Sequence, residues 1–291
     1  MTELSHPEPA AQTWKLTLAY DGTDFQGWQV QPGLPTIQGE LQAALSRITG
    51  ESPLPQGSGR TDAGVHALAQ VASFVLRAPI PADNLLRALN RTLPPAIRVL
   101  DARTVRSTFH ARHSAIAKTY EYRIFPGGNP PPFLARYVYA CHWPLDIAAL
   151  QVAAQHFVGA HDFASFAATD PDRAQRNLAP ESAALAVDNP SIAVAESTLK
   201  TIFSSDWESR STESGHLLIY RVRGSGFLHH MVRNLVGTML DAGRGHLALE
   251  EIPRILAARS RSVAGPTAPA RGLFLHSVEY PPVSLQSCGS L

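Results

Sequence analysis

The part of the chain best suited to chemistry is a glycine-rich stretch around one carboxylate. It has the sequence GSGRTDAGVHA, from Gly57 to Ala67, with three glycines within eight residues. This composition predicts a tight loop, because regular helices and strands tolerate glycine poorly. Asp62 lies in the loop, two residues after Arg60 and four residues before His66. A carboxylate that is held rigidly near a guanidinium can act as a nucleophile or in acid–base catalysis.

Spacing alone does not separate a catalytic loop from a structural turn. An aspartate in a glycine-rich loop commonly caps nearby backbone amides, and the pattern by itself favours that interpretation. Residues 61–64 lack the Asp-Thr/Ser-Gly order of aspartic proteases, and no second copy is present to form a dyad. Residues 57–59 are followed neither by the Gly-Lys-Ser/Thr of a Walker loop nor by a helix signal. The pairs His110/His113 and His229/His230 lack the partners of a zinc site, so we expect no metal.

Several segments of the chain resemble one known family, and they occur in the family's order. The stretch GRTDAGVHALAQVASF (59–74) is similar to the active-site segment of the TruA family of tRNA pseudouridine synthases. The resemblance extends from Tyr20 to Tyr280. The other matching segments are YDGTDFQGWQ (20–29), TIQGELQAAL (36–45), LNRTLP (89–94), FHARHSAIAKTYEYRI (109–124), GAHDFASF (159–166), FLHHMVRNLVGTML (227–240) and TAPARGLFLHSVEY (267–280).

This resemblance implies an isomerase that converts uridine to pseudouridine at positions 38, 39 and/or 40 of the tRNA anticodon stem-loop. Asp62 corresponds to the essential aspartate of the family and would be the nucleophile. No cofactor is implied, because uracil is detached from ribose C1′, turned and rejoined through C5 without net redox change. The sequence leaves open whether the carboxylate attacks the sugar, promotes glycal formation or adds to the base. The family works as a homodimer whose subunits share one tRNA, so the implied partners are tRNA and a second copy of the chain.

The resemblance also assigns roles to residues outside the loop. Arg233 corresponds to the arginine that pairs with the aspartate, and its opposite charge would keep a buried carboxylate ionised. Tyr120 corresponds to the tyrosine that stacks on the target base and helps to remove the C5 proton. Arg60 would contact RNA and help to hold the extruded nucleotide, and Leu273 would form the apolar wall under the uracil. From the residues alone, Tyr120 and Leu273 are equally typical of buried strand positions.

Charge is distributed unevenly along the chain, although the net charge is only +1. Residues 98–123 carry six Arg or Lys against two acids, and residues 221–233 carry three Arg and no acid. In contrast, residues 160–215 carry nine acids against four basic residues. Charge alone is compatible with solvated surfaces, but phosphate binding requires a basic face of this kind. We therefore expect phosphate contacts from Arg112, Lys118, Arg221 and Arg223.

Hydrophobic periodicity predicts the elements that position these residues. Alternation of apolar and polar residues predicts strands at 14–20, 70–76, 119–125, 216–223 and 272–280. Apolar residues at helical spacing predict helices at 37–48 after the N-cap Thr36, and at 81–93, 146–158 and 227–242.

These elements divide the chain into two mixed α/β halves that meet near residue 115. The N-terminal half (13–115) carries the Asp62 loop, and the C-terminal half (116–281) includes an acidic insertion or long loop at about 168–215. Residues 1–12 and 282–291 are expected to be disordered tails. By the resemblance, the fold class is α+β: each half has a mostly antiparallel sheet with packed helices, and together they form the pseudouridine synthase fold around a central basic cleft.

Composition excludes several other classes of protein. A chain of 291 residues that is 44% hydrophobic suits one large domain or two medium ones. A run of about eighteen apolar residues, which a membrane span needs, does not occur, and residues 1–13 lack the pattern of a secretory signal. Cys141 and Cys288 are the only cysteines and support neither a disulfide scaffold nor a cysteine zinc site. We therefore expect a cytoplasmic protein.

Overall fold

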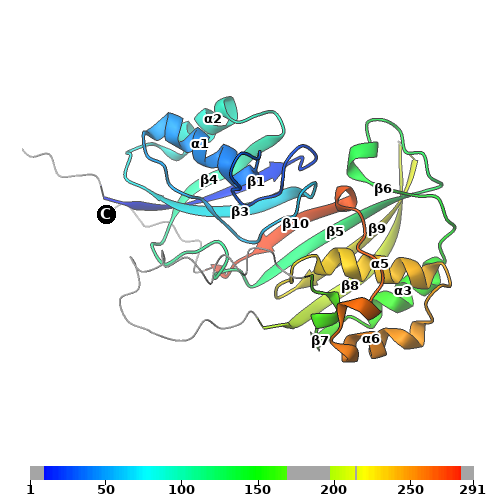
Figure 1. Ribbon diagram of the computed structural model, residues 1–291. Helices are drawn as coiled ribbons and strands as arrows, with labels where there is room; N and C mark the ends of the chain where they lie inside the picture. The colour runs from blue at the N-terminus through cyan, green and yellow to red at the C-terminus, as the bar shows by residue number, and fades with distance from the viewer. Residues whose placement is uncertain (1–9, 169–196, 214, 283–291) are drawn as a thin grey trace, which may run out of the picture. The chain divides into compact units, whose positions relative to one another are not determined.

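The structure is a computed structural model that describes residues 10–168, 197–213 and 215–282 (Figure 1). It contains two compact units that interleave along the chain. Unit 1 comprises Met1–Pro144, Glu208–Arg223 and Pro269–Leu291, and unit 2 comprises Leu145–Trp207 and Gly224–Ala268. The predicted tails lie mostly outside the described residues, and the predicted division of the sequence near residue 115 stays a prediction.

Unit 1 is built on a sheet with the strand order β4-β1-β3-β10-β5-β9, and the C-terminal part of β8 follows β9. Strand β1 pairs antiparallel with β3 and β4, whereas β10 pairs antiparallel with β5 and parallel with β3. The predicted α+β class with a mostly antiparallel sheet is thus confirmed. The strands are β1 (Gln12–Tyr20), β2 (Gln56–Gly57), β3 (His66–Leu76), β4 (Ile97–Val105), β5 (Ala117–Pro126), β6 (Tyr139–Cys141), β8 (Leu199–Thr212), β9 (Gly215–Gly224) and β10 (Leu273–Glu279).

Two α-helices of unit 1, α1 (Ile37–Thr49) and α2 (Ala82–Thr92), lie together over strands β1, β3 and β4 (Figure 1). Helix α1 begins after Thr36, whose side chain accepts a hydrogen bond from the Gly39 amide, and ends at Gly50 in the left-handed region. Both predicted helices are confirmed. Buried residues of the helices and of β1 form the core beneath them: Trp14, Leu16, Leu18, Ile37, Leu41, Leu45, Leu85 and Leu89.

Unit 2 contains the helices α3 (Ile147–Gln155), α5 (Met231–Gly243) and α6 (Ile252–Ala258). Strand β7 (Gly159–Asp162) pairs antiparallel with the first residues of β8. Helix α5 is buried along nearly its whole length, and at Gly237 a Cβ atom would lie 1.6 Å from the carbonyl oxygen of Pro266. In the part of the chain that the structure describes, the short 3₁₀ helices are η1 (Ala135–Tyr137), η2 (Ala164–Phe166), η3 (Leu249–Glu251), η4 (Arg261–Val263) and η5 (Ala270–Gly272).

The structure differs from the sequence-based expectation in several places. Helix α5 starts at Met231 rather than at residue 227, because His230 adopts a positive φ of 58° at the N-cap. Strand β8 includes residues 199–212, which the sequence placed in an insertion or long loop, and residues 169–196 of that segment lie outside the described residues. Strands β2, β4, β6 and β7 and helix α6 were not predicted. In the described ranges, no helix has the length and apolar character needed to cross a bilayer.

Candidate active site

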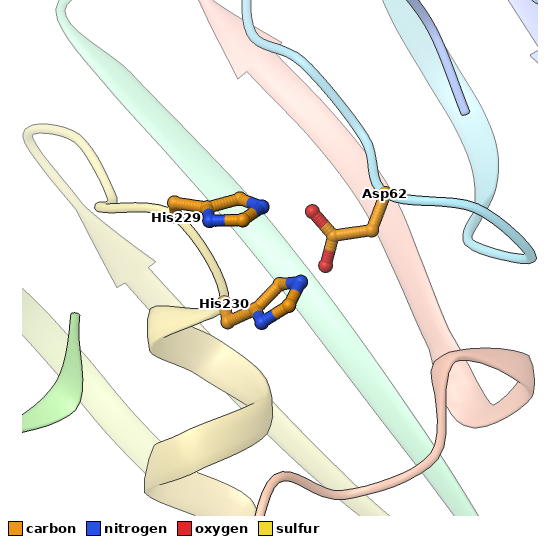
Figure 2. A group of neighbouring side chains, drawn as sticks. All are labelled: Asp62, His229 and His230. Carbon is orange, nitrogen blue, oxygen red and sulfur yellow. The ribbon is translucent and has the colours of Figure 1, made fainter. Parts of the chain in front are cut away.

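Asp62 lies in the loop that leads from β2 into β3, and its side chain is partly exposed (Figure 2). The loop backbone is fixed on both sides of this residue. The amide of Trp28 donates to the carbonyl oxygen of Thr61 at 3.0 Å, and the amide of Val65 donates to the carbonyl oxygen of Asp62 at 3.1 Å. The carboxylate is therefore presented from a backbone with a defined conformation.

Residues 20–29 pack directly on this loop, which explains the two glycines in that segment. A Cβ atom on Gly22 would lie 2.0 Å from the carbonyl oxygen of Val65. A Cβ atom on Gly27, whose φ is +85°, would lie 2.5 Å from the carbonyl oxygen of Thr61. Only glycine permits so close an approach. Residues 20–29 therefore pack against the backbone of the Asp62 loop and restrict its movement.

Tyr120 on β5 lies on the same side of the sheet as the loop. Its hydroxyl oxygen is 4.0 Å from the position that a Cβ atom on Gly59 would take, and its side chain is buried. Burial raises the pKa of Tyr120, and the nearby Tyr20 and the negative charge of Asp62 raise this pKa further. The phenol is therefore protonated at neutral pH and can act as a hydrogen-bond donor.

Leu273 lies close to Tyr120 in the sheet. Leu275 of β10 is the direct partner of Tyr120 on β5. Since alternate residues of a strand point to the same face, Leu273 shares the face of Leu275 and Tyr120, and its side chain is buried. The structure of unit 1 therefore brings the Asp62 loop, Tyr120 and Leu273 together on one face of the sheet.

Lys118 is also on this face, two residues before Tyr120. Its Nζ atom donates to the carbonyl oxygen of Ser58 at 2.6 Å, so the side chain contacts the Asp62 loop itself. Unlike Lys118, Arg60 and Arg112 are exposed. Contact of Arg60, Arg112 or Lys118 with RNA stays a prediction.

Arg221 and Arg223 of β9 are bound to carboxylates. The Nη2 atom of Arg221 is 2.7 Å from Glu121, and Arg223 forms two hydrogen bonds of 2.7 Å with Glu279. Burial of Glu121 opposes its ionisation, but hydrogen bonds from Arg221 and Arg123 lower its pKa overall. Glu121 alternates with Tyr120 on β5, so its side chain and its partner Arg221 lie on the opposite face of the sheet. Phosphate contacts from Arg221 and Arg223 stay predictions, and phosphate would have to compete with these carboxylates.

Arg233 lies in the first turn of α5 in unit 2. Its Nε atom donates to the carbonyl oxygen of Ala268 at 2.7 Å, and the Ala268 amide donates back to the carbonyl oxygen of Arg233 at 3.1 Å. The predicted ion pair between Arg233 and Asp62 would join the two units and stays a prediction. Just before α5, the rings of His229 and His230 lie side by side with centroids 3.9 Å apart (Figure 2).

His66, at the end of the loop, has a structural role that its spacing from Asp62 did not indicate. It is buried, and its Nδ1 atom accepts a hydrogen bond from the Gly22 amide at 3.1 Å. Its Nε2 atom is 3.1 Å and 3.2 Å from the carbonyl oxygens of Arg136 and Arg271, so we assign the ring proton to Nε2. Burial lowers the pKa of His66, while the adjacent Asp21 partly opposes this shift. His66 is therefore neutral at pH 7 and connects three segments behind the loop.

Comparison with known proteins identifies the class. The family model described as tRNA pseudouridine synthase matches residues 17–114 and 153–281. Two bacterial proteins named tRNA pseudouridine synthase A are similar to the chain over 91% of its length and 98% of theirs. The protein from Solibacter usitatus is 50% identical over 267 residues, and that from Moorella thermoacetica is 44% identical over 268 residues.

The fold, the single loop carboxylate and these matches define an RNA-modifying isomerase. The chain belongs to the tRNA pseudouridine synthase family. The resemblance found in the sequence is thereby confirmed.

Proposed function

We propose that this protein isomerises uridine to pseudouridine in tRNA, with the Asp62 carboxylate as its catalytic group. In this reaction the N1–C1′ bond breaks, a C5–C1′ bond forms, C5 loses a proton and N1 gains one. Because no electrons are gained or lost overall, the reaction needs no redox cofactor, and one carboxylate can serve as its catalytic group. The observation that carries the proposal is the placement of Asp62, partly exposed on a loop whose backbone is fixed by Trp28 and Val65.

The other candidate residues take the roles that the family resemblance implies. Tyr120 stacks on the target base and lies next to the atom that loses its proton, and Leu273 forms the apolar wall under the uracil. Arg60 is exposed beside the loop and holds the extruded nucleotide. Arg233 pairs with Asp62 and keeps the carboxylate ionised. These roles are supported by family membership and, for Tyr120 and Leu273, by their common face in the sheet.

The resemblance to the family suggests the finer features of the reaction. We propose that the target uridines are those at positions 38, 39 and/or 40 of the anticodon stem-loop. We further propose that two copies of the chain share one tRNA and that the enzyme acts in the cytoplasm. The free thiol of buried Cys141 is compatible with a reducing compartment.

Tritium release tests the proposed reaction. The wild-type protein is expected to release tritium from tRNA labelled at uracil C5, because the C5 proton is lost when the new glycosidic bond forms. Digestion of the product should yield pseudouridine and no free uracil. Free uracil would instead indicate hydrolysis by an activated water, and bound tRNA without any release would indicate a binding protein; either result contradicts the proposal.

Replacement of Tyr120 by phenylalanine separates the hydroxyl from the ring. We expect kcat to fall about 10-fold, which corresponds to loss of one hydrogen bond, while tRNA affinity is retained because the aromatic ring remains. The measurement is the rate of tritium release at saturating tRNA, together with a binding titration. A wild-type kcat in this variant would exclude a role for the hydroxyl group in the reaction.

A further inference from the structure

Gln70 of β3 is a completely buried amide next to the Asp62 loop. Its Oε1 atom accepts a hydrogen bond from the Ser58 hydroxyl at 2.6 Å. Its Nε2 atom donates to the carbonyl oxygen of Gly59 at 2.9 Å and approaches the Tyr20 hydroxyl at 3.5 Å. One side chain on a rigid strand therefore holds two consecutive residues of the loop.

Tyr20 extends this network toward the carboxylate. Its hydroxyl oxygen is 2.8 Å from the Oγ1 atom of Thr61, the residue immediately before Asp62. Tyr20 is buried, and burial raises its pKa to about 12, so the phenol stays protonated and can keep this hydrogen bond at physiological pH. Through Gln70 and Tyr20, three of the four residues that precede Asp62 are held by buried polar groups.

The buried hydrogen bonds of Gln70 and Tyr20 restrict the conformation of the loop that carries Asp62. Glycines at 57, 59 and 64 give the loop large backbone freedom, which buried hydrogen bonds must restrict if the carboxylate is to keep one orientation. A buried amide that lost its partners would be left unsatisfied, and such groups are costly. The loop conformation in which Gln70 is fully bonded is therefore strongly preferred over its alternatives.

We propose that Gln70 is a positioning residue for the isomerisation, which acts by fixing the backbone that presents Asp62. This inference rests on the proposed function, because it assumes that the Asp62 carboxylate reacts. A displacement of about 1 Å of a reacting group can cost a factor on the order of 100 in rate. Gln70 therefore affects kcat rather than the affinity for tRNA, since its side chain is buried and does not reach the RNA.

The main test replaces Gln70 by methionine, which keeps the length of the side chain and removes its hydrogen bonds to Ser58 and Gly59. Gln38 provides a matched control. It is equally buried, accepts from the Val30 amide at 2.9 Å and donates to the carbonyl oxygen of Pro55 at 2.8 Å, outside residues 57–64. Gln38→Met removes these two buried hydrogen bonds. Gln70→Met removes the bonds to Ser58 and Gly59, the bond from the Val71 amide at 3.1 Å and the contact with the Tyr20 hydroxyl. Only Gln70→Met removes contacts to the Asp62 loop.

We expect Gln70→Met to lower kcat at least about 10-fold with KM and tRNA affinity nearly unchanged, and Gln38→Met to keep the wild-type kcat. A folded Gln70→Met protein with wild-type kcat would overturn the proposal, as would an equal loss of kcat in Gln38→Met. Asp62→Asn is measured in the same assay. Activity of Asp62→Asn contradicts the proposed function, whereas an inactive Asp62→Asn beside a fully active Gln70→Met contradicts only the positioning role.

A second set of variants tests the network without a change at Gln70. Tyr20→Phe and Thr61→Val remove the same hydrogen bond from its two ends. Each is expected to lower kcat, and the double variant should be no slower than the slower single variant, because the shared bond can be lost only once. Wild-type kcat in both single variants, or fully additive losses in the double variant, would overturn the proposal.

Discussion

Asp62→Asn is expected to abolish isomerisation, with a fall in turnover of about 10⁴-fold or more, as is typical when a catalytic group is removed. Asparagine has nearly the same shape as aspartate, but it cannot supply the negative charge or the nucleophilic oxygen. Since Asp62 is partly exposed, the substitution should leave the fold and the tRNA affinity intact. The measurement is single-turnover tritium release, with tRNA binding and thermal unfolding followed in parallel.

Asp24 provides the control for this substitution. It is an exposed aspartate in the segment that packs behind the loop, where it lies 3.3 Å from Arg136. Asp24→Asn is expected to keep the wild-type turnover, because exposed ion pairs contribute little to stability. If Asp62→Asn released tritium as fast as Asp24→Asn, the carboxylate would not be the catalytic group.

Elements with strong local signals were predictable from the sequence. Helix α1 is an example, because Thr36 and Gly50 cap its two ends and the apolar residues between them follow helical spacing. Strand β8 was missed because its residues are mostly polar and alternate weakly, so that its conformation depends on pairing with β7 and β9. Long-range pairing of this kind leaves little trace in a local window of sequence.

The residues of the candidate site also differ in how far the sequence alone could predict them. The glycine-rich pattern alone favoured a structural turn at Asp62, and the resemblance supplied the catalytic role of Asp62 as well as Tyr120, Arg233 and Leu273. The contact between Lys118 and the carbonyl of Ser58 joins residues 60 positions apart, and sequence spacing could not reveal it.

Local charge counting has a similar limit. The stretch 221–233 contains no acid, and this absence suggested arginines available for phosphate. The structure places Glu121, 100 residues away in the sequence, beside Arg221, and Glu279, 56 residues away, beside Arg223. The electrostatic environment of a strand residue is determined by neighbouring strands, so a linear count cannot describe it.

The glycines of the segment 20–29 show how a motif can have a physical cause that only the structure reveals. In sequence, Gly27 and Gly33 are both isolated glycines, and in the structure both have positive φ, at +85° and +73°. Their surroundings differ. A Cβ atom on Gly27 would collide with the Thr61 carbonyl, whereas no atom lies within 4 Å of the Cβ position on Gly33.

Alanine substitutions at these two glycines therefore separate backbone strain from displacement of the loop. Gly33→Ala should cost about 1–2 kcal/mol of stability, since a left-handed conformation is unfavourable for alanine. Gly27→Ala should cost more, because the collision with Thr61 is added to the same backbone strain. Only Gly27→Ala must also push Thr61, and with it Asp62, out of place, and we expect its kcat to fall about 100-fold. The measurements are thermal unfolding and the rate of tritium release at saturating tRNA.

Equal losses of kcat in both variants would mean that strain alone is responsible. A wild-type kcat in Gly27→Ala would mean that catalysis tolerates a displaced loop. The fixed backbone around Asp62 would then not be required for catalysis.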